Sequence, residues 1–216
     1  TTFELVAANS ERFEARTIIL ATGFQEILPA IEGISDYYGK SLFNCPYCEG
    51  WELRDQPLVV IVEDERFGLH MVHLLYNWSH DIVVCTNGHR ILSEKQKDFL
   101  QKYAIQLREE KIVALRGENG HLKQIVFENQ KEIECTGGLV ATPWKQATTI
   151  AEDVGCAMNA FAGIEIDSGG RTTIPGVYAA GDCAVIMPSQ MVLAAASGSN
   201  TAMNIINDLI VSDFPE

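Results

Sequence analysis

The chain of 216 residues is 47% hydrophobic and 21% charged, which is typical of a folded globular protein with one large or two small domains. Its formal net charge of -13 argues against binding to nucleic acid or to an anionic membrane, because both need a basic surface. The longest apolar runs are too short to span a bilayer, no signal peptide is visible, and six unevenly spaced cysteines do not resemble a secreted disulfide scaffold. We therefore expect a cytoplasmic protein.

The N-terminal residues predict the end of a sheet. Residues 2–7 and 12–20 predict two paired strands with a polar turn at Asn9-Ser10-Glu11. The second strand leads into Ala21-Thr22-Gly23, and small residues there let another backbone or a flat ligand approach closely. Because the first strong pattern completes a sheet and the chain starts without methionine, we expect a piece of a longer protein, with a domain crossover near residues 24–28.

The most informative stretch is Asn44-Cys45-Pro46-Tyr47-Cys48-Glu49-Gly50. Two thiols at this spacing, at the start of a helical turn, can form a disulfide, and a helix N-terminus lowers the pKa of a thiol. The favoured interpretation is a redox-active dithiol. The alternatives are half of a zinc site and two unrelated structural cysteines. No second ligand pair at zinc-site spacing accompanies them, so we predict no metal site.

The middle of the chain predicts a βαβ unit. The continuous apolar run at residues 56–62 indicates a strand that is buried on both faces, residues 66–79 have helical spacing, and residues 81–85 predict the next strand. A second helix is expected at 93–103. Short alternating runs at residues 112–115, 122–128 and 131–135 then predict a β-meander with a hairpin turn at Asn119-Gly120, before a last strand at 139–141. This is the layout of a nucleotide-binding domain with a meander insertion.

The turn after the first strand of this unit does not match a dinucleotide site. Such a site needs G-x-G-x-x-G/A, whose glycines let the pyrophosphate rest on backbone N–H groups. Here the turn is Val62-Glu63-Asp64-Glu65-Arg66-Phe67-Gly68, which places three carboxylates where phosphates would bind. The segment Thr86-Asn87-Gly88-His89-Arg90 has no paired arginines for a 2′-phosphate. A vestigial nucleotide domain is the favoured interpretation, and binding through other groups is the alternative.

The last third predicts a ligand site at the end of a strand. In Thr172–Asp182, a buried strand ends in small residues that are followed by Gly181 and Asp182. An acid at this position can accept hydrogen bonds from ligand hydroxyls, although an Asp that caps the next turn is the alternative. A long helix is expected over residues 190–209, and its N-terminus would direct free N–H groups towards an anion.

Three of these blocks carry a family resemblance. Ala21-Thr22-Gly23, the C-x-x-C with its following acid at Cys45–Glu49, and Ile174–Asp182 occur in this order, and Gln190 follows at a matching spacing. The chain resembles the low-molecular-weight thioredoxin reductase family of FAD-dependent disulfide oxidoreductases. The stretch 45–57 is similar to the branch that contains gliotoxin-type dithiol oxidases and uncharacterised bacterial homologues.

The resemblance implies an α/β fold with two Rossmann-like domains of the FAD/NAD(P)-binding type. The FAD-binding domain would be split between residues 1–24 and 151–216 and incomplete at its N-terminus. Residues 25–150 would form an inserted NAD(P)-type domain that carries the C-x-x-C motif. A cytoplasmic homodimer is the expected assembly.

The resemblance also implies roles for single residues. Cys48 matches the thiol next to the flavin, Cys45 matches the thiol that attacks the substrate disulfide, and Glu49 matches the acid that protonates the leaving thiolate. The expected cofactor-binding residues are Thr22, Gly23, Gly181, Asp182, Gln190 and Met191.

Three departures from the family pattern bear on the cofactors. The leading βαβ unit with its own glycine-rich loop, on the order of 80 residues, is absent, which puts flavin binding by this chain alone in doubt. The altered turn and the missing arginines put NADPH in doubt as electron donor. Ser189 stands where the family has an arginine.

The expected function is FAD-dependent thiol-disulfide exchange, in which electrons pass between FAD, the Cys45–Cys48 disulfide and an external disulfide on a thioredoxin-like protein or a small molecule. Ferredoxin or another flavoprotein is an alternative electron source. A dithiol oxidase that uses oxygen, a non-catalytic redox-sensing flavoprotein and a purely structural protein are the alternative functions.

Overall fold

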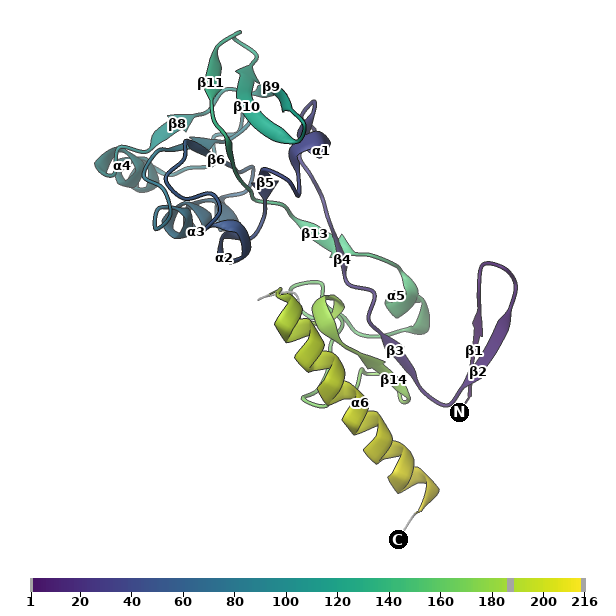
Figure 1. Cartoon of the computed structure of the whole chain (residues 1–216). Coiled ribbons are helices and arrows are strands. Elements are labelled where there is room, and N and C mark those ends of the chain that lie inside the picture. Colours follow the sequence, from purple (N-terminus) through teal and green to yellow (C-terminus); the bar gives the residue numbers. More distant parts are fainter. Residues whose placement is uncertain (1, 186–188, 215–216) are drawn as a thin grey trace. The chain divides into compact units, whose positions relative to one another are not determined.

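The computed structural model describes residues 2–185 and 189–214, and these residues form two compact units (Figure 1). The first unit combines the two ends of the chain, up to Glu26 and from Trp144 onward. The second unit is the continuous segment Ile27–Pro143. Each unit has its own hydrophobic core, and each is described separately below.

The second unit is built on a five-stranded parallel sheet. Its strands lie in the order β5 (Leu42–Phe43), β12 (Gly137–Val140), β6 (Leu58–Ile61), β7 (Ile82–Cys85) and β8 (Gln106–Arg108). Helices α3 (Glu65–Leu75) and α4 (Glu94–Lys102) connect consecutive strands, and the short helices α1 (Ile34–Tyr37) and α2 (Pro46–Glu49) come before β6. The βαβ unit that the sequence predicts is therefore confirmed.

Both faces of this sheet are buried, which explains why its strands are continuous apolar runs. Val60 and Val84 point into the core formed with α3 and α4. Their neighbours Val59 and Val83 point into the opposite core, which is covered by the antiparallel meander β9 (Ile112–Glu118), β10 (His121–Phe127) and β11 (Glu132–Glu134). Figure 1 shows the meander and the two helices on opposite sides of the sheet.

In the described residues of the first unit, short strands form three pairs. β1 (Phe3–Val6) pairs with β2 (Arg12–Ala15), β3 (Ile18–Leu20) with β14 (Val177–Ala179), and β4 (Phe24–Glu26) with β13 (Trp144–Gln146). The helical elements are α5 (Ile150–Val154), the 3₁₀ turn η1 (Gly181–Cys183) and the long helix α6 (Met191–Asp213). The core lies between β3, β14 and α5.

One strand prediction is wrong. The sequence predicts a single strand over residues 12–20 that pairs with residues 2–7, but the chain forms two strands with different partners. β2 pairs antiparallel with β1, whereas β3 pairs parallel with β14. The N–H of Ile18 also donates to the carbonyl of Gly176 at 3.0 Å, so β3 is bound to the C-terminal half of the chain from its first residue.

Helix α6 is attached to its unit by polar contacts. The Asp208 carboxylate accepts hydrogen bonds from Nε and Nη2 of Arg171, both at 2.6 Å, and from the Tyr178 hydroxyl at 2.6 Å. Nearer its end, Asp213 pairs with Arg16. These contacts fix the rotation of the helix about its axis, so they determine which of its residues face the end of β14.

None of the helices in the described part of the chain combines the length and apolar character needed to cross a lipid bilayer.

Candidate functional site

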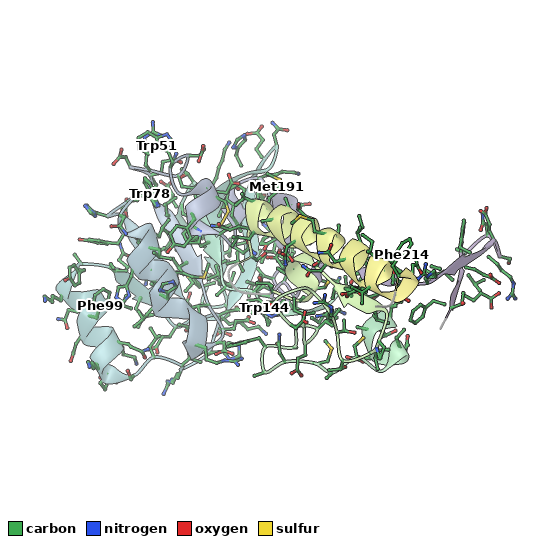
Figure 2. All side chains as sticks on the ribbon, turned by 90° about the horizontal axis from the view of Figure 1, so that it is seen from below. Trp51, Trp78, Phe99, Trp144, Met191 and Phe214 are labelled. Carbon is green, nitrogen blue, oxygen red and sulfur yellow. A yellow bond between two sulfur atoms is a disulfide. The ribbon has the colours of Figure 1, made fainter. Side chains whose placement is uncertain are left out.

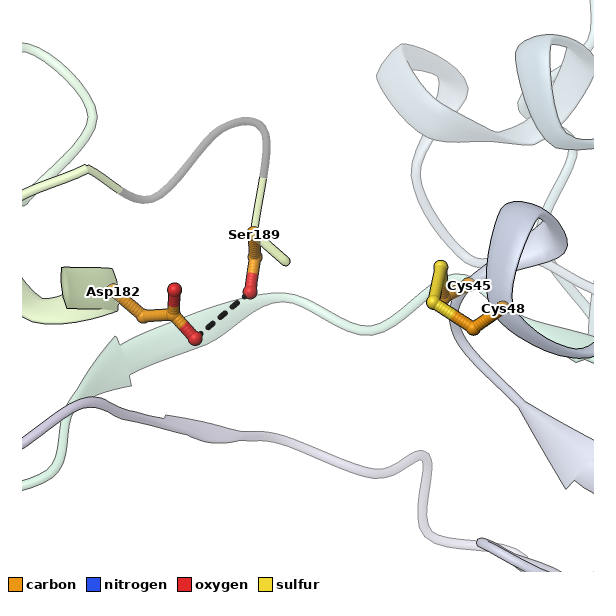
Figure 3. The surroundings of a disulfide bond; sticks show 4 residues. All are labelled: Cys45, Cys48, Asp182 and Ser189. Carbon is orange, nitrogen blue, oxygen red and sulfur yellow. Dashed lines mark hydrogen bonds between the residues drawn. A yellow bond between two sulfur atoms is a disulfide. The ribbon is translucent and has the colours of Figure 1, made fainter. Parts of the chain in front are cut away.

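Cys45 and Cys48 form a disulfide across the single turn of helix α2, with their Cα atoms 5.4 Å apart (Figure 3). Cys45 is extended and immediately precedes the helix, and Pro46 begins it with the φ angle that a helix requires. The N–H groups of Cys48 and Glu49 both donate to the Cys45 carbonyl, at 3.2 and 3.3 Å. The backbone therefore holds the two sulfurs within bonding distance, as their spacing predicts.

The disulfide pair differs from the other cysteines in exposure. Cys48 is exposed and Cys45 is half-buried, whereas Cys85, Cys135, Cys156 and Cys183 are all buried. Burial raises the pKa of the Cys135 thiol to about 12, and it raises the pKa of Cys85 even further. Because the thiolate is the reactive form, these two thiols are inert at neutral pH. Only the C-x-x-C pair combines proximity with access to a reaction partner among the described cysteines.

Helix α2 is followed by a residue without a side chain, Gly50, which lies against Trp78 in the segment after α3. A Cβ atom on Gly50 would overlap the indole of Trp78 and the carbonyl of Pro46. Glycine at this position thus lets the turn of the C-x-x-C motif pack directly on Trp78, which itself contacts the core of the unit. This packing gives the disulfide a rigid base.

A cavity of about 280 Å³ lies at the carboxyl ends of β3 and β14 in the first unit. Its walls consist of small residues and one carboxylate, contributed by Ala21, Gly23, Ala180, Gly181, Asp182, Ala194 and Gly198. Gly181 has φ +72°, a left-handed conformation that favours glycine, and its N–H donates to Ser197 Oγ of helix α6 at 3.1 Å. This bond ties the floor of the cavity to the helix.

Asp182 is the charged residue of this cavity. Its carboxylate accepts a hydrogen bond from the Ser189 hydroxyl at 2.9 Å, just before helix α6 begins (Figure 3). Ser189 takes the place of an arginine expected from the family pattern, so the carboxylate receives a neutral partner here instead of a cation. Among residues 2–185 and 189–214, Ser189 bonds one oxygen of this carboxylate, and the other oxygen can accept a bond from a ligand hydroxyl.

The structure brings together some of the expected cofactor-binding residues and not others. Gly23, Gly181 and Asp182 line the cavity, whereas Thr22, Gln190 and Met191 are not among its lining residues. Ala194 and Gly198 are functional candidates that sequence reasoning missed. The available signal was their spacing, because small residues four positions apart lie on the same face of a helix.

The cavity fits the flat part of a flavin. Cβ atoms added to Gly23 or Gly198 would meet no atom of the described residues within 4 Å beyond their chain neighbours and, for Gly198, its own helix backbone, so both glycines leave open space that a ring system can occupy. Asp182 supplies an acceptor for hydroxyl groups at the same place. The residues fit the ring and ribityl parts of FAD. The chain offers no glycine-rich loop for the phosphates of FAD, because no two glycines in the sequence have the G-x-G spacing of a phosphate-binding loop.

In the second unit, the turn between β6 and α3 is occupied by its own side chains. The Asp64 carboxylate caps α3 by accepting the N–H of Arg66 at 3.0 Å, and it also pairs with the Arg66 guanidinium. The hydrogen bonds from Arg66 lower the pKa of Asp64 to about 2. Glu63 accepts a bond from Asn87 Nδ2 at 2.6 Å. A carboxylate therefore stands at the helix N-terminus, where a dinucleotide would place its pyrophosphate.

Among residues 2–185 and 189–214, no three His, Cys, Asp or Glu side chains are grouped so that they could hold a metal ion.

Comparison with known proteins gives consistent similarities. The family model described as pyridine nucleotide-disulphide oxidoreductase matches residues 1–199. The thioredoxin reductase of Helicobacter pylori and thioredoxin reductase aclD of Aspergillus oryzae are each 25% identical over 96% of this chain, and the matches cover 70% and 68% of those proteins. The solved structure of TrxB from Bacillus anthracis is 39% identical, with a TM-score of 0.95 over 99% of this chain and 71% of that one. The chain spans only 51% of another curated relative, about half of its length.

Proposed function

The chain belongs to the pyridine nucleotide-disulphide oxidoreductase family, and on this premise we propose that it forms part of a thioredoxin reductase-like enzyme. In this enzyme, Cys45 and Cys48 would exchange electrons with FAD on one side and with an external disulfide on the other. The observation that carries the proposal is the accessible disulfide across α2. The similarity to proteins named thioredoxin reductase supports the same chemistry.

The exchange with substrate would take two steps. The Cys45 thiolate attacks one sulfur of the substrate disulfide, which forms a mixed disulfide and releases the first substrate thiolate. Glu49, half-buried directly after Cys48, would supply the proton for that leaving group. The Cys48 thiolate then attacks Cys45 Sγ, so the protein disulfide forms again and the second substrate thiolate leaves. Two electrons pass to the substrate in each cycle.

The two ends of the chain would hold the flavin. Gly23 and Gly181 offer close approach for a ring system, and Asp182 would bind ribityl hydroxyls. Thr22, Gln190 and Met191 remain proposed contacts of the cofactor. The chemistry that FAD supplies when bound is a two-electron exchange with the Cys45–Cys48 disulfide. We accordingly propose that the first unit is the FAD-binding part and that the second unit is an NAD(P)-type domain.

The charge at the N-terminus of α3 bears on the identity of the electron donor. Asp64 occupies the N-terminus of α3 and its charge opposes a pyrophosphate, which favours a donor other than NADPH. Ferredoxin or another flavoprotein could then reduce the FAD. In a dithiol oxidase the electrons would flow the other way, from a substrate dithiol to FAD and then to oxygen. A redox sensor without turnover is the alternative from another functional class. A thioredoxin-like partner, a homodimer and a cytoplasmic location stay predictions.

The test is an anaerobic titration of the full-length protein followed by its visible flavin absorption. We expect dithionite to bleach the flavin band and NADPH to leave it unchanged. Bleaching by NADPH would show that the nucleotide binds in spite of Asp64. Replacement of Cys45 or Cys48 by serine should abolish disulfide turnover, and Cys156→Ala, at a buried cysteine of the first unit, serves as the control. Unchanged turnover in either serine variant would refute the proposed function.

A further inference from the structure

Two large aromatic side chains stand exposed beside the disulfide. Tyr47 lies between the two cysteines and has 67% of its surface exposed, and Trp51 follows one turn later with 57% exposed. Aromatic side chains normally bury much of their large apolar surface. Their exposure on the short segment that carries the exposed Cys48 therefore calls for a ligand-based explanation.

Trp51 is held rigidly although it is exposed. Its ring meets Trp78 edge-on at a centroid distance of 5.9 Å, and Figure 2 shows the two indoles as neighbours. The Arg54 guanidinium lies 4.1 Å from the centre of the Trp51 ring, and Arg54 Nη1 donates to the Trp51 carbonyl at 2.8 Å. A ring fixed in this way loses little conformational freedom when a ligand binds to it, which favours affinity.

The charges around these rings are mainly negative. Glu49, Glu52 and Asp55 lie within the same short segment, and Arg54 is the one cation between Cys45 and Pro57. The guanidinium of Arg54 is already engaged over the Trp51 ring. The guanidinium keeps its positive charge there, so a cationic ligand would be repelled at the Trp51 ring and an anionic one by the three carboxylates, whereas a neutral ligand would meet neither repulsion.

The size of the surface points to a small ligand. One aromatic side chain buries roughly 150–250 Å², so two rings offer at most about 500 Å². A stable protein–protein interface needs about 800 Å² on each partner. The surface matches a small molecule whose rings can lie against Tyr47 and Trp51.

We propose that Tyr47 and Trp51 form a binding surface for small, neutral aromatic disulfides, and that they orient the substrate sulfur towards Cys45. This inference rests on the proposed function, and it deepens it by naming the substrate class. The exchange follows the two steps given above, with reduced FAD as the source of the electrons. Anionic disulfides and acidic protein disulfides are the substrates that this surface disfavours.

The test measures turnover by the full-length protein, with its flavin kept reduced photochemically as the source of electrons. Three disulfides serve as probes: dithiodipyridine is neutral and aromatic, dithiobis(nitrobenzoate) is anionic and aromatic, and cystamine is cationic and aliphatic. We expect Trp51→Ala to raise KM for dithiodipyridine about tenfold with kcat unchanged, since one aromatic contact contributes on that scale. KM for cystamine should stay unchanged. The wild-type protein should have a lower KM for dithiodipyridine than for dithiobis(nitrobenzoate).

Two further variants separate a binding role from a structural one. Trp51→Phe keeps a ring at the same place and should restore most of the affinity for dithiodipyridine. Tyr103→Ala removes an exposed aromatic ring just after helix α4, where it contacts Phe99 and Lys102 instead of the disulfide, and should change no KM. If Trp51→Ala fails to fold, Tyr47→Ala takes its place, because the Tyr47 side chain is more exposed.

The proposal is overturned if Trp51→Ala raises KM equally for all three probes, or if it affects only turnover of a protein disulfide. The Cys45→Ser variant tests the underlying function separately. If Cys45→Ser loses turnover with every probe, the dithiol chemistry is supported. If KM for every probe is at the same time unchanged in Trp51→Ala, the aromatic surface alone is refuted.

Discussion

Replacing Gly198 by leucine is expected to weaken flavin binding while stabilising helix α6. Gly198 lies inside the helix and on the wall of the cavity, and a Cβ atom there would meet no atom of the described residues within 4 Å beyond its chain neighbours and its own helix backbone. Glycine inside a helix costs about 1 kcal/mol relative to alanine, and leucine is nearly as favourable as alanine. The free energy of unfolding of the flavin-free protein should therefore rise by up to about 1 kcal/mol, which corresponds to a Tm increase of about 2–4 °C at this size.

The same side chain would enter the space that the flavin needs. Overpacking costs about 1–3 kcal/mol, so flavin affinity should fall by about ten- to a hundredfold. Flavin content is measured by absorption and by fluorescence after release, and Tm by calorimetry of the flavin-free protein. Ser199→Leu is the matched control, because residue 199 is exposed on α6 outside the cavity lining. Full flavin content in Gly198→Leu would show that the cofactor binds elsewhere, and a lower Tm would show that the space beside Gly198 is filled.

Two further predictions concern packing and pH. Burial, together with the hydrogen bond to Asp208, raises the pKa of Tyr178 to about 12. The folded state therefore favours the protonated phenol, so its contribution to stability should be complete below about pH 10 and lost as the pH rises towards 12. In Asp208→Asn the pKa of Tyr178 should fall, as measured by ultraviolet titration; an unchanged midpoint would contradict the role of the carboxylate. Gly50→Ala should lower stability by about 1–3 kcal/mol and alter tryptophan fluorescence, because the added Cβ overlaps the Trp78 indole; an unchanged Tm and spectrum would exclude tight packing of Gly50 on Trp78.

The family resemblance visible in the sequence is confirmed by the match over residues 1–199 and by the likeness to TrxB. The α/β fold was predictable for a related reason. Strands buried on both faces must be apolar at every position, so β6 and β7 are recognisable as short uninterrupted runs of Val, Ile and Leu. The C-x-x-C spacing likewise brings two thiols within reach of each other through local backbone geometry alone.

The turn at Glu63 and Asp64 was predictable only in part. The sequence shows that carboxylates replace the glycines of a phosphate-binding loop. It does not show that Asp64 caps α3 and pairs with Arg66, or that Glu63 bonds Asn87 in the turn after β7. Arg66 lies only two residues after Asp64, so that pair is local, whereas the bond between Glu63 and Asn87 depends on how the elements pack.

Local features could be predicted from the residues alone: the apolar strands, the dithiol and the acid after Gly181. These follow from periodicity and from the backbone preferences of single residues. Three other features became visible in the folded protein: residues 12–20 divide between two partners, Ala194 and Gly198 complete the cavity with Gly23, and Trp51 is fixed against Trp78. Each of these depends on contacts between segments far apart in the chain or on the rotation of a helix about its axis, which packing and long-range hydrogen bonds set and local sequence does not encode.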